Sequence, residues 1–199
     1  MMQINYTKDI VGKFDAILAR GLCAGVGSRD GQMCVEAAIC AVLNMPHGDN
    51  PTCVTPAVRG YKIRLNDSEH WGSPTTRAEG LRALGLAQIG SAGVVDGVAF
   101  TARLAEKTIR VLLPDLFRRF TDHPGMLAAA DRCEREGTRA AAAAAYAAAY
   151  AANANANAAA AAAACFVGVS QEYYLRLSAK LALEVLIELK SPGVAFLSL

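Results

Sequence analysis

Apolar residues recur along most of this chain at intervals of three and four, which is the spacing of one face of an α-helix. Ile10, Phe14 and Leu18 follow this spacing, and Gly21 is expected to end the first helix. Residues 32–43 differ because almost every position is apolar, so we predict a second helix that is central in the fold. No stretch shows the sustained alternation with a period of two that indicates a half-buried strand. The pattern therefore predicts an all-α protein.

Turn and cap residues place the borders of the later helices. Thr55-Pro56 and Ser73-Pro74 each combine an N-cap residue with a proline at the first helical position, so they open helices that run to about Leu65 and Gln88. Further helices are predicted from about Val94 to Leu113, stopping before Pro114, from Asp115 to Phe120, and from Pro124 towards Glu136. Together with two C-terminal helices they predict one helical domain over residues 1–199, a bundle of seven or eight helices.

The two C-terminal helices are expected to form an antiparallel hairpin. One is a long Ala-rich helix at about 138–167, and the other is a Leu-rich helix at about 171–190. Four polar residues and Arg139 fall on one stripe of the Ala-rich helix, and these four are the candidate interaction residues: Tyr146, Tyr150, Asn153 and Asn157. Two interpretations stay open, because the Ala surface suits close packing either against helices of the same chain or against a second copy.

Charge and polarity narrow the classes of partner. The chain has 20 basic and 18 acidic residues, so it lacks the basic excess typical of nucleic-acid binding, and we expect no nucleic-acid partner. The pair Arg118-Arg119 has acidic residues nearby and is expected to lie on a solvated helix face. Residues 140–170 carry no formal charge, but Ala contributes little apolar area and the Asn residues would need partners in lipid, so we expect no membrane span.

The N-terminus and the cysteines indicate a cellular compartment. The first residues contain no charged leader followed by an apolar run, so no secretory signal is predicted. Six cysteines are scattered without close pairs, as expected for reduced, buried thiols. We therefore expect a cytoplasmic protein.

One group of residues at the start of the second helix could carry thiol chemistry. Cys34 lies at a helix N-terminus, where the positive end of the helix dipole would lower the pKa of its thiol. Gln32 stands two residues before Cys34, an arrangement that resembles papain-type thiol enzymes, although the aromatic residue that follows the Cys in that family is missing here. The remaining weak candidates are a base, His47 or His70, and an orienting group from Asp49, Asn66 or Asp67. The alternative is a buried structural Cys, and we favour it.

Zinc is a second hypothesis for the same region. Five potential ligands fall within 31 residues: Cys23, Cys34, Cys40, His47 and Cys53. They include no Cys-x-x-Cys pair. No cofactor is therefore expected.

Glu36 is the one charged residue inside the apolar second helix. A buried carboxylate needs a cationic or hydrogen-bonding partner, and we predict Arg59 or Arg77 for this role. Such a pair is structural in most proteins, and the alternative is a functional site for a cationic group.

Several segments carry a resemblance. GQMCVEAAIC (31–40), KIRLND (62–67), RAEGLRALGLAQIGS (77–91) and ELKSPG (188–193) resemble segments of a group of small helical bacterial or phage proteins with no assigned function. The resemblance implies a bacterial or phage origin and transfers no functional residue. We predict a non-catalytic structural or protein-interaction module that binds a protein partner or a second copy of itself, with a thiol-dependent enzyme or zinc protein centred on Cys34 as the alternative.

Overall fold

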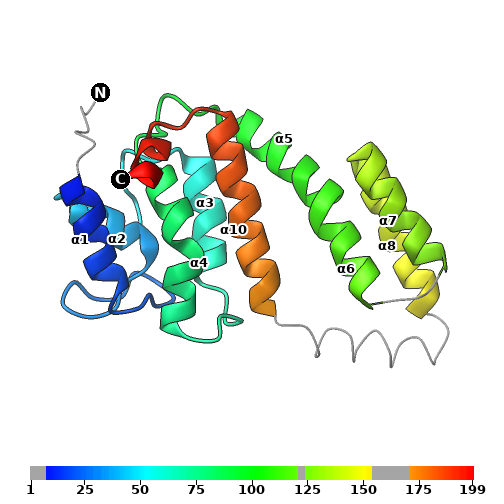
Figure 1. Ribbon diagram of the computed structural model, residues 1–199, viewed down its shortest axis with the longest axis horizontal. Helices are drawn as coiled ribbons and strands as arrows, with labels where there is room; N and C mark the ends of the chain where they lie inside the picture. Colours follow the sequence, from blue (N-terminus) through cyan, green and yellow to red (C-terminus); the bar gives the residue numbers. More distant parts are fainter. Residues whose placement is uncertain (1–7, 121–123, 154–170) are drawn as a thin grey trace. The chain divides into compact units, whose positions relative to one another are not determined.

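The computed structural model describes residues 8–120, 124–153 and 171–199 (Figure 1). Within these residues the chain forms nine α-helices and no strand, which confirms the all-α prediction. The helices are α1 (Lys8–Leu18), α2 (Val35–Val42), α3 (Pro56–Asn66), α4 (Pro74–Ala87), α5 (Gly97–Lys107), α6 (Leu113–Phe120), α7 (Pro124–Glu136), α8 (Arg139–Asn153) and α10 (Gln171–Glu188). A π-helical turn, Thr108–Leu112, joins α5 to α6, and a 3-10 helix, Pro192–Ser198, follows α10. No helix in the described ranges is long and apolar enough to cross a membrane.

The chain gathers into two compact units. Unit 1 contains Met1–Thr101 and Ser178–Leu199, and unit 2 contains Ala102–Leu177. The two units are described separately below, and the single domain expected over residues 1–199 stays a prediction.

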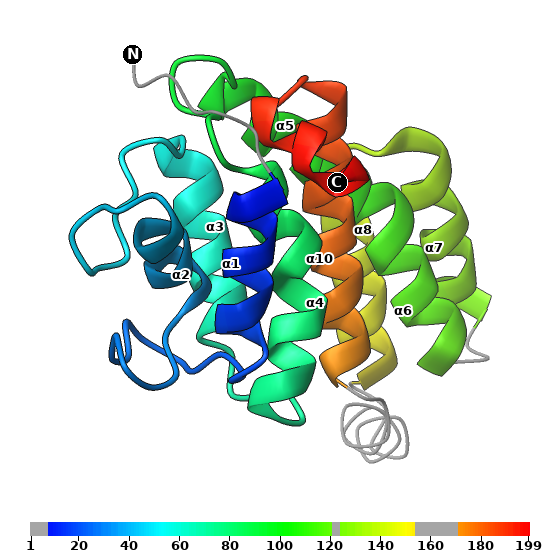
Figure 2. The same ribbon diagram turned by 60° about the vertical axis from the view of Figure 1, so that its left-hand side comes forward.

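Helix α2 is buried in unit 1, as its apolar sequence predicted. It packs against α1, α3 and α4 (Figure 2). Seven of its eight residues are buried, because the helix lacks a polar face. It begins at Val35 rather than near residue 32, because Cys34 has an extended backbone and serves as the N-cap.

The predicted start signals of α3 and α4 are confirmed. Both helices have a proline in the first turn, and the Ser73 side chain accepts a hydrogen bond from the backbone of Thr76, while Thr76 bonds back to Ser73. This reciprocal capping box fixes the entry of the chain into α4.

The 3-10 helix at the C-terminus was not predicted. It docks on the end of α4, where the Ser191 hydroxyl donates to the carbonyl of Ala87 over 2.5 Å. Gly193 lies so close to this helix end that an added Cβ would be 2.3 Å from the carbonyl oxygen of Leu86. Ser191 therefore supplies a partner for the Ala87 carbonyl in the last turn of α4.

In unit 2 the prediction that a helix stops before Pro114 is wrong. The helix continues through a π turn in which the Leu113 N–H donates to the Thr108 carbonyl, five residues back. Pro114 is the second residue of α6, directly after the π turn, and it removes one N–H donor from the continuing helix. The wider π turn relieves the clash between a proline ring and the carbonyl four residues before it.

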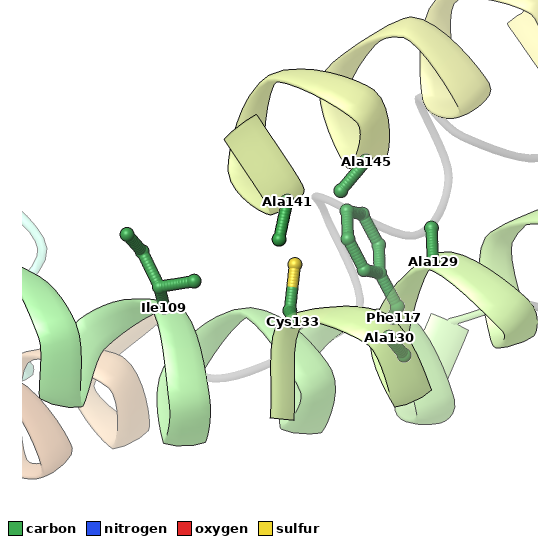
Figure 3. Packing of buried hydrophobic residues seen from close by; sticks show 7 residues of the cluster. All are labelled: Ile109, Phe117, Ala129, Ala130, Cys133, Ala141 and Ala145. Atoms are coloured by element: carbon green, nitrogen blue, oxygen red, sulfur yellow. The ribbon is translucent and has the colours of Figure 1, made fainter. Parts of the chain in front are cut away.

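The core of unit 2 is made mostly of small side chains (Figure 3). Ala141 and Ala145 of α8 pack with Ala129, Ala130 and Cys133 of α7, and Ile109 and Phe117 complete the cluster. The Ala-rich helix therefore has α7 as an intramolecular partner in its described part. Residues 154–170, which contain the rest of the predicted Ala-rich helix and its turn into the last helix, lie outside the described residues.

Candidate functional site

The thiol of Cys34 caps the start of α2. Its Sγ accepts a hydrogen bond from the Ala37 N–H at 3.3 Å, so it satisfies one of the open donors at the start of α2. The residue is 3% exposed, and burial raises the pKa of the thiol, because the thiolate would lose its hydration. The expectation that the helix N-terminus lowers this pKa is therefore wrong, since desolvation outweighs the dipole. A buried thiol with a raised pKa is a poor nucleophile at neutral pH.

Glu36 has the buried cationic partner that its position required, but the partner is Lys62. The Lys62 Nζ lies 3.1 Å from Glu36 Oε1, and both side chains are 0% exposed. Lys62 belongs to α3, four residues before the end of that helix, and its side chain extends to Glu36 in α2. The pair therefore ties two helices together inside the core.

The amide of Gln88, just after α4, completes the buried cluster. Its Nε2 donates to Glu36 Oε2 at 2.9 Å, so the carboxylate bonds to groups from two other helical segments. Burial raises the pKa of Glu36 and lowers the pKa of Lys62, because each charge loses hydration, and the attraction between the two opposes both shifts. The cluster connects α2, α3 and the end of α4.

The two arginines predicted as partners of Glu36 lie elsewhere. Arg59 contributes only a weaker electrostatic attraction that lowers the pKa of Glu36. Arg77 donates from Nη1 to the Leu22 carbonyl and from Nη2 to the Ser68 carbonyl. Lys62 was not among the predicted partners. It lies on α3 three residues after Arg59, whereas Arg77 belongs to α4.

Asn66 and Asp67, weighed above as orienting groups for a histidine, instead hold residues 21–31, a loop between α1 and α2 that contains four glycines. The Asn66 side chain accepts from Val35 N at 3.2 Å and donates to the Cys23 carbonyl at 2.8 Å. Asp67 accepts from Gly25 N at 2.8 Å. The end of α3 therefore fixes the loop that leads into α2.

His47 also contacts this loop. Its Nε2 lies 3.2 Å from the Gly27 carbonyl, so this nitrogen is the donor and carries the proton. Gly27 has a positive φ of 69°, and an added Cβ would lie 2.3 Å from the Gln32 carbonyl oxygen. His47 thus belongs to the packing of a tight turn.

A small cavity lies beside these groups. Its lining includes Cys34, Glu36, Asp49, Asn66 and Asp67, and its volume is about 10 Å³. That volume suits about one water molecule, whereas pockets for small-molecule ligands usually measure about 300–1,000 Å³. The cavity therefore lacks the room for a small-molecule substrate.

The five candidate zinc ligands do not form a metal-binding group in the described part of the chain. No group of three or more Cys, His, Asp or Glu side chains there has an arrangement that could hold a metal ion. Cys34, Cys40 and Cys53 are buried and Cys23 is half-buried. Burial raises the pKa of the Cys40 thiol to about 11, so this residue acts as a small hydrophobic side chain.

The candidate interaction residues fall at the edge of what the structure describes. The backbones of Tyr146, Tyr150 and Asn153 lie in α8, but their side chains are outside the described part, as is the whole of Asn157. The described exposed residues of α8 are Arg139 and three alanines, Ala140, Ala143 and Ala147, and the alanines lie three and four residues apart. They form one narrow alanine stripe.

Comparisons with known proteins add no functional information: no family model, curated protein or solved structure matches this chain.

Proposed function

We propose that this protein is a non-catalytic structural or protein-interaction module of the cytoplasm. The proposal rests on one observation: the residues of unit 1 that could carry out chemistry make contacts inside the fold. Cys34 caps α2, Glu36 pairs with Lys62, and Asn66 holds the loop before α2. The adjoining cavity has room for about one water molecule. These residues thus have internal structural tasks.

We further propose that the partner is a second copy of the chain, which binds through the outer surface of α8. The inner alanines of this helix already pack against α7, while Ala140, Ala143 and Ala147 are exposed. Alanine methyl groups let two helix backbones approach closely, so a second helix could lie along this stripe. The zinc or thiol-enzyme alternative has less support, since the Cys34 thiol is buried and its pKa is raised.

Native mass spectrometry of the full chain, purified without chelator, tests the proposal. We expect a discrete oligomer with no added mass. The variants Ala143→Glu and Ala147→Glu place charge on the stripe and should shift the protein towards monomer. Ala128→Glu, at an exposed alanine of α7, is the matched control and should leave the oligomer intact.

Two results would overturn the proposal. A monomer in wild type and in all three variants removes self-association through α8. A zinc-sized adduct that disappears in Cys34→Ser would instead favour the metal-site alternative.

A further inference from the structure

A surface groove in unit 2 gathers three arginines. It has a volume of about 440 Å³ and lies between the π turn with α6 on one side and α7 on the other. Arg110, Arg118 and Arg119 line it, together with the carboxylates of Asp115 and Glu134. The volume is within the usual range of small-molecule sites, about 300–1,000 Å³.

The π turn contributes directly to this groove. Arg110 and Val111 belong to the turn and line the groove, and Val111 is exposed although it is apolar. π turns inserted in α-helices occur frequently at functional sites. This local geometry is an observation separate from the arginine cluster.

Arg110 has a structural task that makes the groove wall rigid. Its Nη1 donates to the carbonyls of Glu134 and Arg135 at 2.8 and 2.7 Å, and its Nη2 donates to that of Glu136 at 3.1 Å. These are open carbonyls at the C-terminus of α7. Arg110 therefore holds α7 against the π turn.

Arg118 and Arg119 keep donors for a ligand. Arg118 uses only Nη2, which bonds to Asp131 and Glu134, and Arg119 uses Nε and Nη2, which bond to Asp115 and the Tyr173 hydroxyl. Among the described residues, the Nη1 groups of both arginines have no hydrogen-bond partner. The Arg119 guanidinium also lies 4.3 Å from the centre of the Tyr173 ring, which restricts its orientation.

We propose that this groove binds a phosphate group carried as a monoester or as inorganic phosphate. The carboxylates already present are monoanions, so a ligand must carry more negative charge or more acceptor oxygens to replace them. A phosphate monoester has a charge of about −1.5 to −2 near pH 7 and three acceptor oxygens. The exposed ion pairs of Arg118 and Arg119 contribute little stability and can be exchanged, while they hold the guanidiniums in place before the ligand arrives.

The three groove arginines pair with four carboxylates, those of Glu106, Asp115, Asp131 and Glu134, so a ligand has to displace carboxylates, and the positive charge belongs to unit 2 as a whole. Residues 102–177 contain nine basic and seven acidic side chains, so unit 2 carries the whole formal net charge of +2. The inference does not depend on the proposed function, because it requires neither self-association through α8 nor the cluster around Glu36.

Titration calorimetry of the full chain with inorganic phosphate and with phosphoserine tests the site. We expect saturable binding that weakens about tenfold or more in Arg118→Gln and in Arg119→Gln, since each variant removes a charged donor. Arg29→Gln, at an exposed arginine of unit 1, is the control and should bind as wild type does. Circular dichroism melting curves check that the variants fold, which is expected at these exposed positions.

Three outcomes would overturn the inference. The first is that binding does not saturate at millimolar phosphate. The second is that the Arg29 control loses as much affinity as the groove variants. The third is that a thymidine oligonucleotide binds more tightly, per phosphate group, than inorganic phosphate does. The last outcome would mean that the surface is a general electrostatic attractor for phosphodiesters.

Discussion

Removing Lys62 should destabilise unit 1 in a way that depends on pH. In Lys62→Met the Glu36 carboxyl group stays buried, at 0% exposure, but loses the ammonium 3.1 Å away. Gln88 still donates one hydrogen bond, which is not enough to stabilise a buried negative charge. The folded protein then avoids the charge by protonating Glu36.

The cost of that protonation can be worked out from the ordinary pKa of a glutamate. Each pH unit above about 4.3 costs about 1.36 kcal/mol, so the variant should lose about 3.7 kcal/mol of unfolding free energy at about pH 7. The loss should fall to about 1 kcal/mol near pH 5. The sign follows from the raised pKa of Glu36: a group whose folded pKa is above its unfolded value destabilises the fold increasingly as pH rises past the unfolded value.

Glu36→Gln should show the opposite pH dependence. Here the Lys62 ammonium must lose its proton, which costs about 4.6 kcal/mol near pH 7 and about 1.9 kcal/mol near pH 9, because the ordinary lysine pKa is about 10.4. Burial lowers the pKa of Lys62 in the folded chain, in agreement with this direction. The double variant Glu36→Leu/Lys62→Met should be more stable than either single variant, since it leaves no buried charge.

Urea unfolding followed by circular dichroism at several pH values measures these differences. Lys180→Met, at an exposed lysine of α10 in unit 1, is the control and should change stability little. The reasoning is refuted if Lys62→Met loses the same free energy at pH 5 and pH 7, or if Glu36→Gln is as stable as wild type.

Three further predictions concern stability. Cys34→Ala should lower the free energy of unfolding by about 1 kcal/mol because it removes the N-cap acceptor of α2, whereas the hydroxyl of Cys34→Ser should still cap the helix and keep most of this stability. Equal losses for the two variants in urea unfolding would contradict the capping role. Gly193→Ala should lower the melting temperature by several degrees because the new Cβ meets the Leu86 carbonyl, while Gly48→Ala, which has open space, serves as the control. Arg110→Gln should cost about 1–3 kcal/mol through the lost bonds to the end of α7, and unchanged hydrogen exchange at that helix end would count against this prediction.

The sequence predicted the helices of this protein well where local chemistry decides the outcome. The starts of α3 and α4 follow from Thr55-Pro56 and Ser73-Pro74, because capping depends on residues close together in the chain. The burial of α2 likewise follows from its composition. These properties require no knowledge of how the helices pack.

The failures involve contacts between distant segments. The continuation through Pro114 depends on a π turn, which apolar periodicity does not encode. The 3-10 helix at the C-terminus is stabilised by docking on α4, through Ser191 and the close approach of Gly193. A local sequence pattern predicts neither the π turn nor the docking of the 3-10 helix on α4.

The candidate site shows the same division. The need of Glu36 for a buried partner followed from its place in an apolar helix, but the identity of that partner did not. The ion pair forms with Lys62 and not with Arg59, although the two residues are three apart and neighbours on the surface of the same helix. The pKa of Cys34 was misjudged because the helix dipole is a local property, whereas burial of the thiol is a property of the whole fold.

The most direct test of the central claim is the rate at which iodoacetamide modifies each cysteine of the native full chain, measured by peptide mass spectrometry across a range of urea concentrations. The claim is that Cys34 is a structural cap. Its modification should therefore occur only as the protein unfolds globally, and the same holds for the buried Cys40 and Cys53. Half-buried Cys23 should react at lower urea concentrations. Fast modification of Cys34 in the folded protein at neutral pH would contradict the account and identify an accessible, activated thiol.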